Sequence, residues 1–265
     1  MEAAKLPYPG LIGSLIYTCL TRPDVQYSIS NVAMYMSRWG VKHYEHAMRI
    51  LKYLYHTRHK TLTYQKWKGD VVLQCYVDAN YGDKRDSGYD DKWRSQGGYL
   101  VFVGDCLVPW SSKRHRCVTL SSMEAEYVEA ARSAQEVVWF RRLMRDLGYG
   151  LKFPTVLWED NKAAIAFSKN HTCHDRSKHI DIREHWLREL VSGQEVKMLH
   201  VATAHQMANF MTKHLRTPAQ ILATDIVLGG FPLPKEGHNI QEKINFVKTS
   251  IPKSGMLELG DIECY

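Results

Sequence analysis

The pattern of hydrophobic positions divides the chain into a helical part and a later part that contains strands. Within residues 8–60, apolar side chains recur at steps of three and four, which predicts amphipathic helices. One stripe runs from Val25 to Met36, and a second runs from Tyr44 to Tyr55 with several Lys, Arg and His residues beside it. The basic face of the second stripe is typical of a solvated helical hairpin, or of a surface that touches a nucleic-acid backbone.

From residue 71 the hydrophobic period changes to one that favours strands. Residues 71–77 predict a strand, and residues 98–103 and 106–110 predict a hairpin around the turn Gly104-Asp105. Ser121 followed by Glu124 has capping-box spacing and predicts a helix that ends near Gly148. Further strands are predicted at 155–159 and 195–201, and further helices near Asn161 and at 178–191 and 204–214. This α/β order indicates a mixed sheet covered by helices.

Composition limits the classes of protein that this chain can belong to. The 265 residues are 45% hydrophobic and carry a formal net charge of +7, which permits binding to nucleic acid without establishing it. The six cysteines form no CxxC pair, which favours a reducing compartment over a disulfide framework. The sequence has no signal-peptide pattern and no apolar run long enough for a membrane span. We therefore expect an intracellular protein, cytoplasmic or nuclear, that is not secreted and has no membrane partner.

Three acidic residues lie at the ends of predicted elements. Asp78 closes one apolar run, Asp160 ends another, and Glu124 lies at the start of the helix that follows Ser121. Any one of them is typical of a cap or a turn, but together they predict three carboxylates that converge on one patch and need a cation. Mg²⁺ prefers such hard oxygen ligands, and a pair of Mg²⁺ ions supports phosphodiester cleavage.

The acidic neighbours of these residues are expected to point elsewhere. Glu126 lies roughly 200° round the helix from Glu124 and should face away from the metals. Glu159 precedes Asp160 on a strand and should point to the other face of the sheet.

Several blocks of sequence occur in an order that carries a family resemblance. They are VDANY at 77–81, GGY at 97–99, WSSKRH at 110–115, TLSSMEAEY at 119–127, DNKAAI at 160–165, KHIDIREH at 178–185 and QMANFMTKHL at 206–215. These blocks resemble the ribonuclease H domain of copia-type LTR retrotransposon polyproteins. Upstream, SLIYTCLTRPDV at 14–25 is similar to the C-terminal part of the reverse transcriptase region in the same polyproteins.

The resemblance implies a fold and a division of the chain. The implied fold is a ribonuclease H-like mixed five-stranded sheet with helices on both faces, preceded by a helical segment. Residues 1–65 would be a helical remnant of the reverse transcriptase C-terminal or connection region, 70–215 the ribonuclease H-like domain, and 216–265 a poorly patterned extension. The implied activity is cleavage of the RNA strand of RNA–DNA hybrids with Mg²⁺, or with Mn²⁺ in its place. The polymerase region of the same element would be a partner.

The resemblance also implies site residues. Asp78, Glu124 and Asp160 match three of the family's four metal-binding carboxylates, and Asn209 stands where the family has the fourth. An amide keeps an oxygen ligand but lacks the negative charge, so metal affinity should fall. This departure leaves open a weakened or inactive fragment that only binds nucleic acid. The nucleic-acid contacts would come from Lys113, Arg114, Arg116 and Asn161, although the stretch 113–116 is also typical of a solvated turn.

Overall fold

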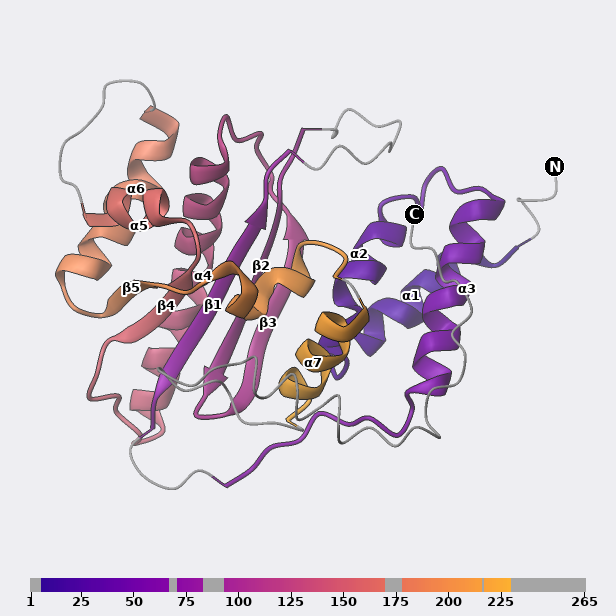
Figure 1. Ribbon diagram of the computed structural model, residues 1–265, viewed down its shortest axis with the longest axis horizontal. Coiled ribbons are helices and arrows are strands. Elements are labelled where there is room, and N and C mark those ends of the chain that lie inside the picture. The colour runs from indigo at the N-terminus through magenta and orange to yellow at the C-terminus, as the bar shows by residue number, and fades with distance from the viewer. Residues whose placement is uncertain (1–5, 67–70, 83–92, 170–177, 216, 230–265) are drawn as a thin grey trace.

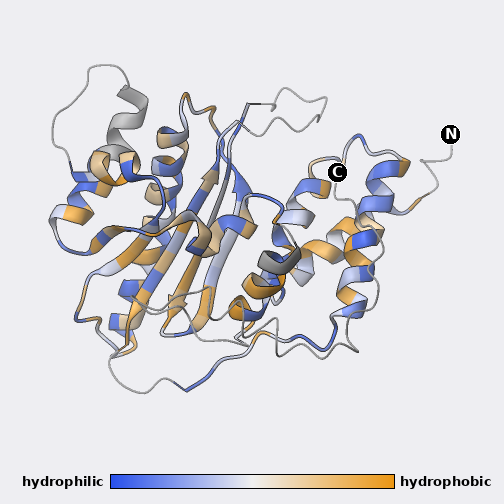
Figure 2. Cartoon of the chain, viewed as in Figure 1, coloured by the Kyte–Doolittle hydropathy of each residue, from blue (hydrophilic) through white to orange (hydrophobic). Residues whose placement is uncertain are grey.

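The computed structural model describes residues 6–66, 71–82, 93–169, 178–215 and 217–229 (Figure 1). The predicted helices near the N-terminus are α1 (Tyr8–Thr18), α2 (Gln26–Ala33) and α3 (Val41–His56), with the short 3-10 helix η2 (Pro23–Val25) before α2. Their apolar stripes meet in one core that includes Tyr8, Ile12 and Ile29. The exposed turns of α3 are mainly hydrophilic, as Figure 2 shows. No described helix is long and apolar enough to cross a membrane.

The rest of the described chain is built on one mixed sheet. Its strands are β1 (Leu73–Asn80), β2 (Gln96–Val103), β3 (Cys106–Arg114), β4 (Thr155–Glu159) and β5 (Val196–His200), in the order β3-β2-β1-β4-β5. β1, β2 and β3 are antiparallel neighbours, whereas β4 is parallel to β1 and β5 is parallel to β4. The predicted hairpin is confirmed, and Gly104 takes the positive φ of 61° that its turn requires.

Helices cover both faces of this sheet (Figure 1). One face packs against α4 (Ser122–Asp146), with α5 (Lys162–Lys169) and α6 (Lys178–Ser192) beside it. The other face packs against the 3-10 helix η4 (Met207–Met211) and α7 (Thr217–Val227). Alternate residues of β1 point to opposite cores, since Cys75 and Val77 lie in the first and Tyr76 in the second. The predicted mixed five-stranded sheet, with helices on both faces and a helical segment before it, is confirmed.

The end of the chain differs from the sequence prediction. Residues 204–214, predicted as a helix, form the short 3-10 helices η3 (Thr203–His205) and η4. Within the extension predicted to be poorly patterned, residues 217–227 form α7, which buries Ala223, Ile226 and Val227 at helical spacing. The stripe covers only two turns, so its period was too short to stand out from the sequence. Residues 230–265 of the predicted extension lie outside the described residues.

The helical N-terminal part packs against the sheet and α7. Trp110 of β3 donates from its indole nitrogen to the carbonyl oxygen of Cys19, over 3.1 Å. Lys60 forms an ion pair of 2.6 Å with Asp225 of α7. The backbone amide of Thr63 also donates to the carbonyl oxygen of Leu228. These contacts join the first part of the chain to the sheet, and the predicted division into 1–65, 70–215 and 216–265 stays a prediction.

Candidate metal centre

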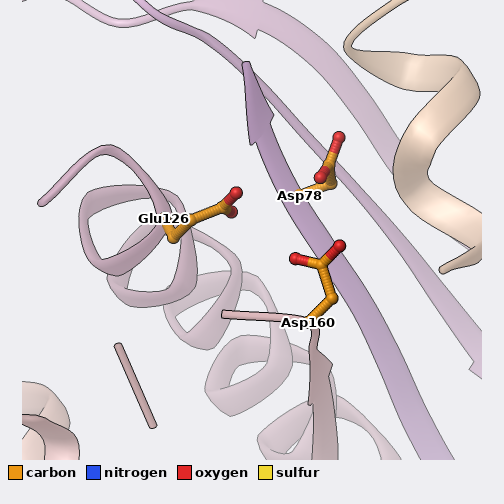
Figure 3. Close-up of side chains that lie close together, drawn as sticks. All are labelled: Asp78, Glu126 and Asp160. Carbon is orange, nitrogen blue, oxygen red and sulfur yellow. The ribbon is translucent and has the colours of Figure 1, made fainter. Parts of the chain in front are cut away.

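Three carboxylates meet at one end of the sheet. One side-chain oxygen from each of Asp78, Glu126 and Asp160 lies within 4.8 Å of the other two. Figure 3 shows that Glu126 projects from α4, Asp78 from β1 and Asp160 from the chain just beyond β4. Asp78 and Glu126 are buried, and Asp160 is half-buried. We call these three residues the acid cluster.

Strand register brings the two aspartates together. β1 and β4 are parallel, and their last paired residues are Tyr76 and Trp158. The same register continued by two residues places Asp78 opposite Asp160, and paired residues of parallel strands project from the same face. β1 continues to Asn80, so Asp78 lies inside the strand and not at its end as the sequence suggested. The predicted meeting of Asp78 and Asp160 is nevertheless what the structure has.

The glutamate of the cluster is Glu126, which corrects the assignment of Glu124. Ser121 caps α4 by accepting from the amide of Glu124, as the capping-box spacing predicted. The Glu124 carboxylate turns back to accept from the amide of Leu120, over 2.7 Å, and so acts as a helix cap. Glu126 instead heads the buried stripe of α4 that continues at Ala130 and Ala134. The two glutamates lie about 200° apart around α4, as expected, but Glu126 and not Glu124 faces the two aspartates.

Burial and like charge make Glu126 hard to ionise. Burial raises its pKa to about 11, and the negative charges of Glu159, Asp78 and Asp160 add to the rise. Its Oε2 atom is buried and has no hydrogen-bond partner among the described residues. Burial also raises the pKa of Asp78, against the opposing effects of Lys213 and Thr212. A cation placed among these oxygens would offset the charges and favour the ionised carboxylates.

Glu159 projects from the face of the sheet opposite Asp160, as strand alternation predicts, and it still lies close enough to the acid cluster to interact with it. It is fully buried, and burial, with the charges of Asp160 and Asp78, raises its pKa to about 8. One oxygen accepts from the backbone amide of Asn161, over 3.0 Å, and this bond lowers the pKa. Alternate residues of β4 point to opposite faces of the sheet, so Glu159 and Asp160 project in opposite directions. Glu126 comes from α4, which packs on the same face as Glu159, and this brings the two glutamates together.

Residues 206–213 hold the strands that carry the aspartates. The side-chain amide of Gln206 donates to the carbonyl oxygens of Val77 and Trp158, at 2.8 and 3.2 Å. It therefore bridges β1 and β4 at the end of their paired segment. Thr212 donates from its hydroxyl to Asp78, and the ammonium of Lys213 lies 3.7 Å from the same carboxylate oxygen. We call residues 206–213 the bridging segment.

A glycine lets the bridging segment approach the sheet. Gly98 pairs with Asp78 across β1 and β2. A Cβ atom on Gly98 would lie only 2.5 Å from Cβ of Met211. Ser112 of β3 donates to the carbonyl oxygen of Met211, over 2.6 Å, and fixes the segment in this place. The absence of a side chain at 98 therefore sets how closely residues 211–213 cover Asp78.

Comparison with known proteins identifies the chain. It is 36% identical, over 211 residues and 79% of its length, to the retrovirus-related Pol polyprotein from transposon TNT 1-94 of Nicotiana tabacum. The chain belongs to the copia-type Pol polyprotein family. It spans 15% of the length of that tobacco relative. No protein-family model matches the chain.

Two solved structures are among those similar to this chain. LC11-RNase H1, isolated from compost, is 10% identical with a TM-score of 0.40, covering 53% of this chain and 92% of that one. The foamy viral protease-reverse transcriptase in complex with dsDNA is 12% identical with a TM-score of 0.45, covering 75% of this chain and 38% of that one.

Asn209, the predicted counterpart of the family's fourth acid, lies in η4 and is buried. Its side-chain nitrogen donates to the carbonyl oxygen of Thr203, over 2.8 Å, while its Oδ1 is buried without a partner among the described residues. The backbone oxygen of Asn209 lies 3.1 Å from the hydroxyl oxygen of Thr212, which bonds Asp78. Asn209 is thus linked to the acid cluster through Thr212, and its role as a metal ligand stays a prediction.

The predicted nucleic-acid contacts of this Pol segment differ in their exposure. Lys113 and Arg116 are exposed at the end of β3 and just beyond it. Arg114 is half-buried, with two of its guanidinium nitrogens out of contact with solvent. The side-chain oxygen of Asn161 accepts from the amides of Ala163 and Ala164 and caps the start of α5. Lys113 and Arg116 are therefore the better placed of the four to meet a phosphate backbone.

Proposed function

We propose that this chain is a ribonuclease H-like nuclease that cleaves the RNA strand of RNA–DNA hybrids with Mg²⁺, or with Mn²⁺ in its place. One observation carries the proposal, namely the meeting of Asp78, Glu126 and Asp160 within 4.8 Å at the end of the sheet. The family membership supports it, because the resemblance that runs through these same blocks implies this reaction.

The residues present fit a divalent cation. The acid cluster offers three carboxylates, which are the hard oxygen ligands that Mg²⁺ prefers. Glu126 is 6% exposed and Asp78 is 1% exposed, so their negative charges have little water to solvate them. The buried Oε2 of Glu126 has no hydrogen-bond partner among the described residues, so a cation or one of its water ligands could satisfy it. Three acids without a cation would repel one another in this buried setting.

Each part of the site has a task in this proposal. Cations bound to the acid cluster would supply an activated water and a positive charge on the reacting phosphate. The Gln206 amide keeps the ends of β1 and β4 at a fixed separation, and so fixes Asp78 against Asp160. Lys113 and Arg116 hold the phosphate backbone at the end of β3. Recognition of the 2′-hydroxyl would restrict cleavage to the RNA strand.

The proposal extends to the surroundings of the protein. The substrate would be the hybrid formed during reverse transcription, so the polymerase region of the same element is the partner that supplies it. The protein would then act inside the cell, in the cytoplasm or the nucleus. The four described cysteines are unpaired, which fits a reducing compartment.

The departure at Asn209 favours a second candidate function. With one carboxylate fewer than the family pattern, the site attracts cations less strongly, and the chain would then bind hybrid without cutting it. The two candidates differ in one measurable step, which is the appearance of RNA fragments.

A gel assay on an RNA–DNA hybrid labelled on the RNA strand tests the proposal. The wild-type protein should release RNA fragments with Mg²⁺ or Mn²⁺ and none with EDTA. Glu126→Gln should abolish the cleavage, whereas the matched variant Glu124→Gln keeps a capping oxygen and should retain most of it. Hybrid binding without any cleavage by the wild type would select the binding-only fragment. Equal losses in the two variants would contradict the assignment of Glu126.

A further inference from the structure

The acid cluster has a basic neighbour that the sequence motifs did not single out. The ammonium of Lys213 lies 3.7 Å from Oδ2 of Asp78. In the part of the chain that the structure describes, it is the one basic side chain in an ion pair with the three acids. The same Asp78 oxygen accepts a hydrogen bond from Thr212.

The two partners of Asp78 differ in their freedom to move. Thr212 is fully buried, and its hydroxyl oxygen, which donates its one hydrogen to Asp78, also lies 3.1 Å from the backbone oxygen of Asn209. The Lys213 side chain is 38% exposed, whereas the side chain of Asp78 is 2% exposed. Lys213 therefore lies at the solvent side of the site, on a long flexible stem, with its charge turned inward.

A divalent cation on Asp78 would compete with this ammonium. Both are attracted to the same carboxylate oxygen, and two like charges cannot lie close together on it without repulsion. The ion pair is partly exposed and longer than a good charge-assisted hydrogen bond, so little holds Lys213 in place. Once displaced, its ammonium would remain at the mouth of the site, where a reacting phosphate must enter.

We propose that Lys213 alternates between two anions: it neutralises Asp78 when no metal is bound, and it holds a phosphate of the nucleic-acid substrate when the metal takes Asp78. This rests on the proposed function. It adds a substrate-binding residue from the bridging segment, and it makes metal binding and substrate binding support each other. Lysine suits the role because it binds phosphate as a movable point charge.

Three variants test the proposal. Lys213→Met removes the charge but keeps the length of the side chain, Lys213→Arg keeps the charge, and Lys197→Met removes a charge from an exposed position on β5 as the matched control. Mg²⁺ binding to each free protein is measured by titration calorimetry. Binding of a short labelled RNA–DNA hybrid is measured at several salt concentrations with Ca²⁺ in place of Mg²⁺, so that cleavage is not needed for a signal.

The two measurements should move in opposite directions. Lys213→Met should bind Mg²⁺ several-fold more tightly, because the competing ammonium is gone. The same variant should bind the hybrid several-fold more weakly, and the slope of log Kd against log salt should fall by about one phosphate contact. Lys213→Arg should restore the slope, and Lys197→Met should match the wild type in both measurements.

Either of two results overturns the proposal. Mg²⁺ binding that is unchanged or weaker in Lys213→Met would mean that Lys213 does not compete for Asp78. A salt slope equal to that of the wild type would mean that Lys213 holds no phosphate. Failure of the proposed function can be told apart from failure of this proposal. A wild type that binds Mg²⁺ and hybrid but never cleaves would still give the Mg²⁺ titration and the salt slope on which this proposal is tested. Melting temperatures measured in parallel identify any variant that has lost its fold.

Discussion

Replacing Glu126 by Gln should stabilise the metal-free protein at neutral pH. The wild-type carboxyl is buried beside other acids, and its pKa rises from 4.5 to about 11 in the folded protein. Between these two values the folded state keeps a proton that the unfolded state has released. Stability is therefore greatest at or below the unfolded pKa and falls as the pH rises toward the folded pKa.

The size of this effect follows from the two pKa values. The free energy of unfolding falls by about 1.4 kcal/mol for each pH unit between them. At pH 7.5 the accumulated loss is about 4 kcal/mol relative to pH 4.5, because three pH units separate the two conditions. Glutamine has no proton to keep and escapes this loss, but burying its unpaired amide costs about 1–3 kcal/mol. We expect a net gain of about 1–3 kcal/mol in Glu126→Gln at pH 7.5.

Urea unfolding measures the effect directly. The wild type, Glu126→Gln and Glu124→Gln are unfolded in EDTA at a series of pH values from 5 to 8, and again with Mg²⁺. In EDTA the gap between the wild type and Glu126→Gln should widen as the pH rises, while Glu124→Gln should follow the wild type. Mg²⁺ should raise the stability of the wild type and leave Glu126→Gln much less changed. Parallel pH dependences in EDTA would refute the claim that Glu126 is buried as a neutral acid.

Three other substitutions test the supports of the site. Gln206→Ala leaves the carbonyl oxygens of Val77 and Trp158 without their shared donor, so it should lower stability by about 1–3 kcal/mol and weaken Mg²⁺ binding. The control is Gln135→Ala, at an exposed position of α4. Equal Mg²⁺ titrations for the two variants would argue against a bridging role of Gln206. Asn209→Asp restores the missing charge and should lower the Mg²⁺ concentration at half-saturation and raise cleavage; the same half-saturation in both proteins would place the defect elsewhere. Gly98→Ala forces a Cβ to within 2.5 Å of Met211, so chemical denaturation should show a loss of about 1–3 kcal/mol, and a neutral result would show that the bridging segment can move aside.

The parts of the site that follow from repeating geometry were accessible from the sequence. Asp78 and Asp160 end hydrophobic runs of two strands, and parallel register then brings their side chains together. The choice between Glu124 and Glu126 needed a further fact, namely which side of α4 faces the sheet. The small residues Ala130 and Ala134, at helical spacing after Glu126, carry that signal, since a helix packs closely where its side chains are small. The capping box drew attention to the other glutamate.

The remaining parts depend on tertiary contacts between residues that are far apart in the chain. Gln206 contacts Val77 across 129 positions, and no local pattern marks a glutamine as the bridge between two strands. The sequence predicts a helix over the stretch that contains Lys213, but this stretch forms a 3-10 helix followed by a bend. Helical spacing therefore could not predict that the Lys213 side chain points to Asp78. The buried face of α7 was missed for a related reason, since two turns give too short a period to detect.

The bridging segment also sets when this site can exist during synthesis. A ribosome delivers Asp78 first, then Glu126 and Asp160, and only afterwards the residues that join β1 to β4 and cover Asp78. A nascent chain that has emerged as far as residue 200 already contains all five strands and all three acids. It still lacks Gln206, Thr212 and Lys213, so its carboxylates are not yet held in place. Because translation adds residues in this order, the acid cluster is held in place only after the bridging segment has been made.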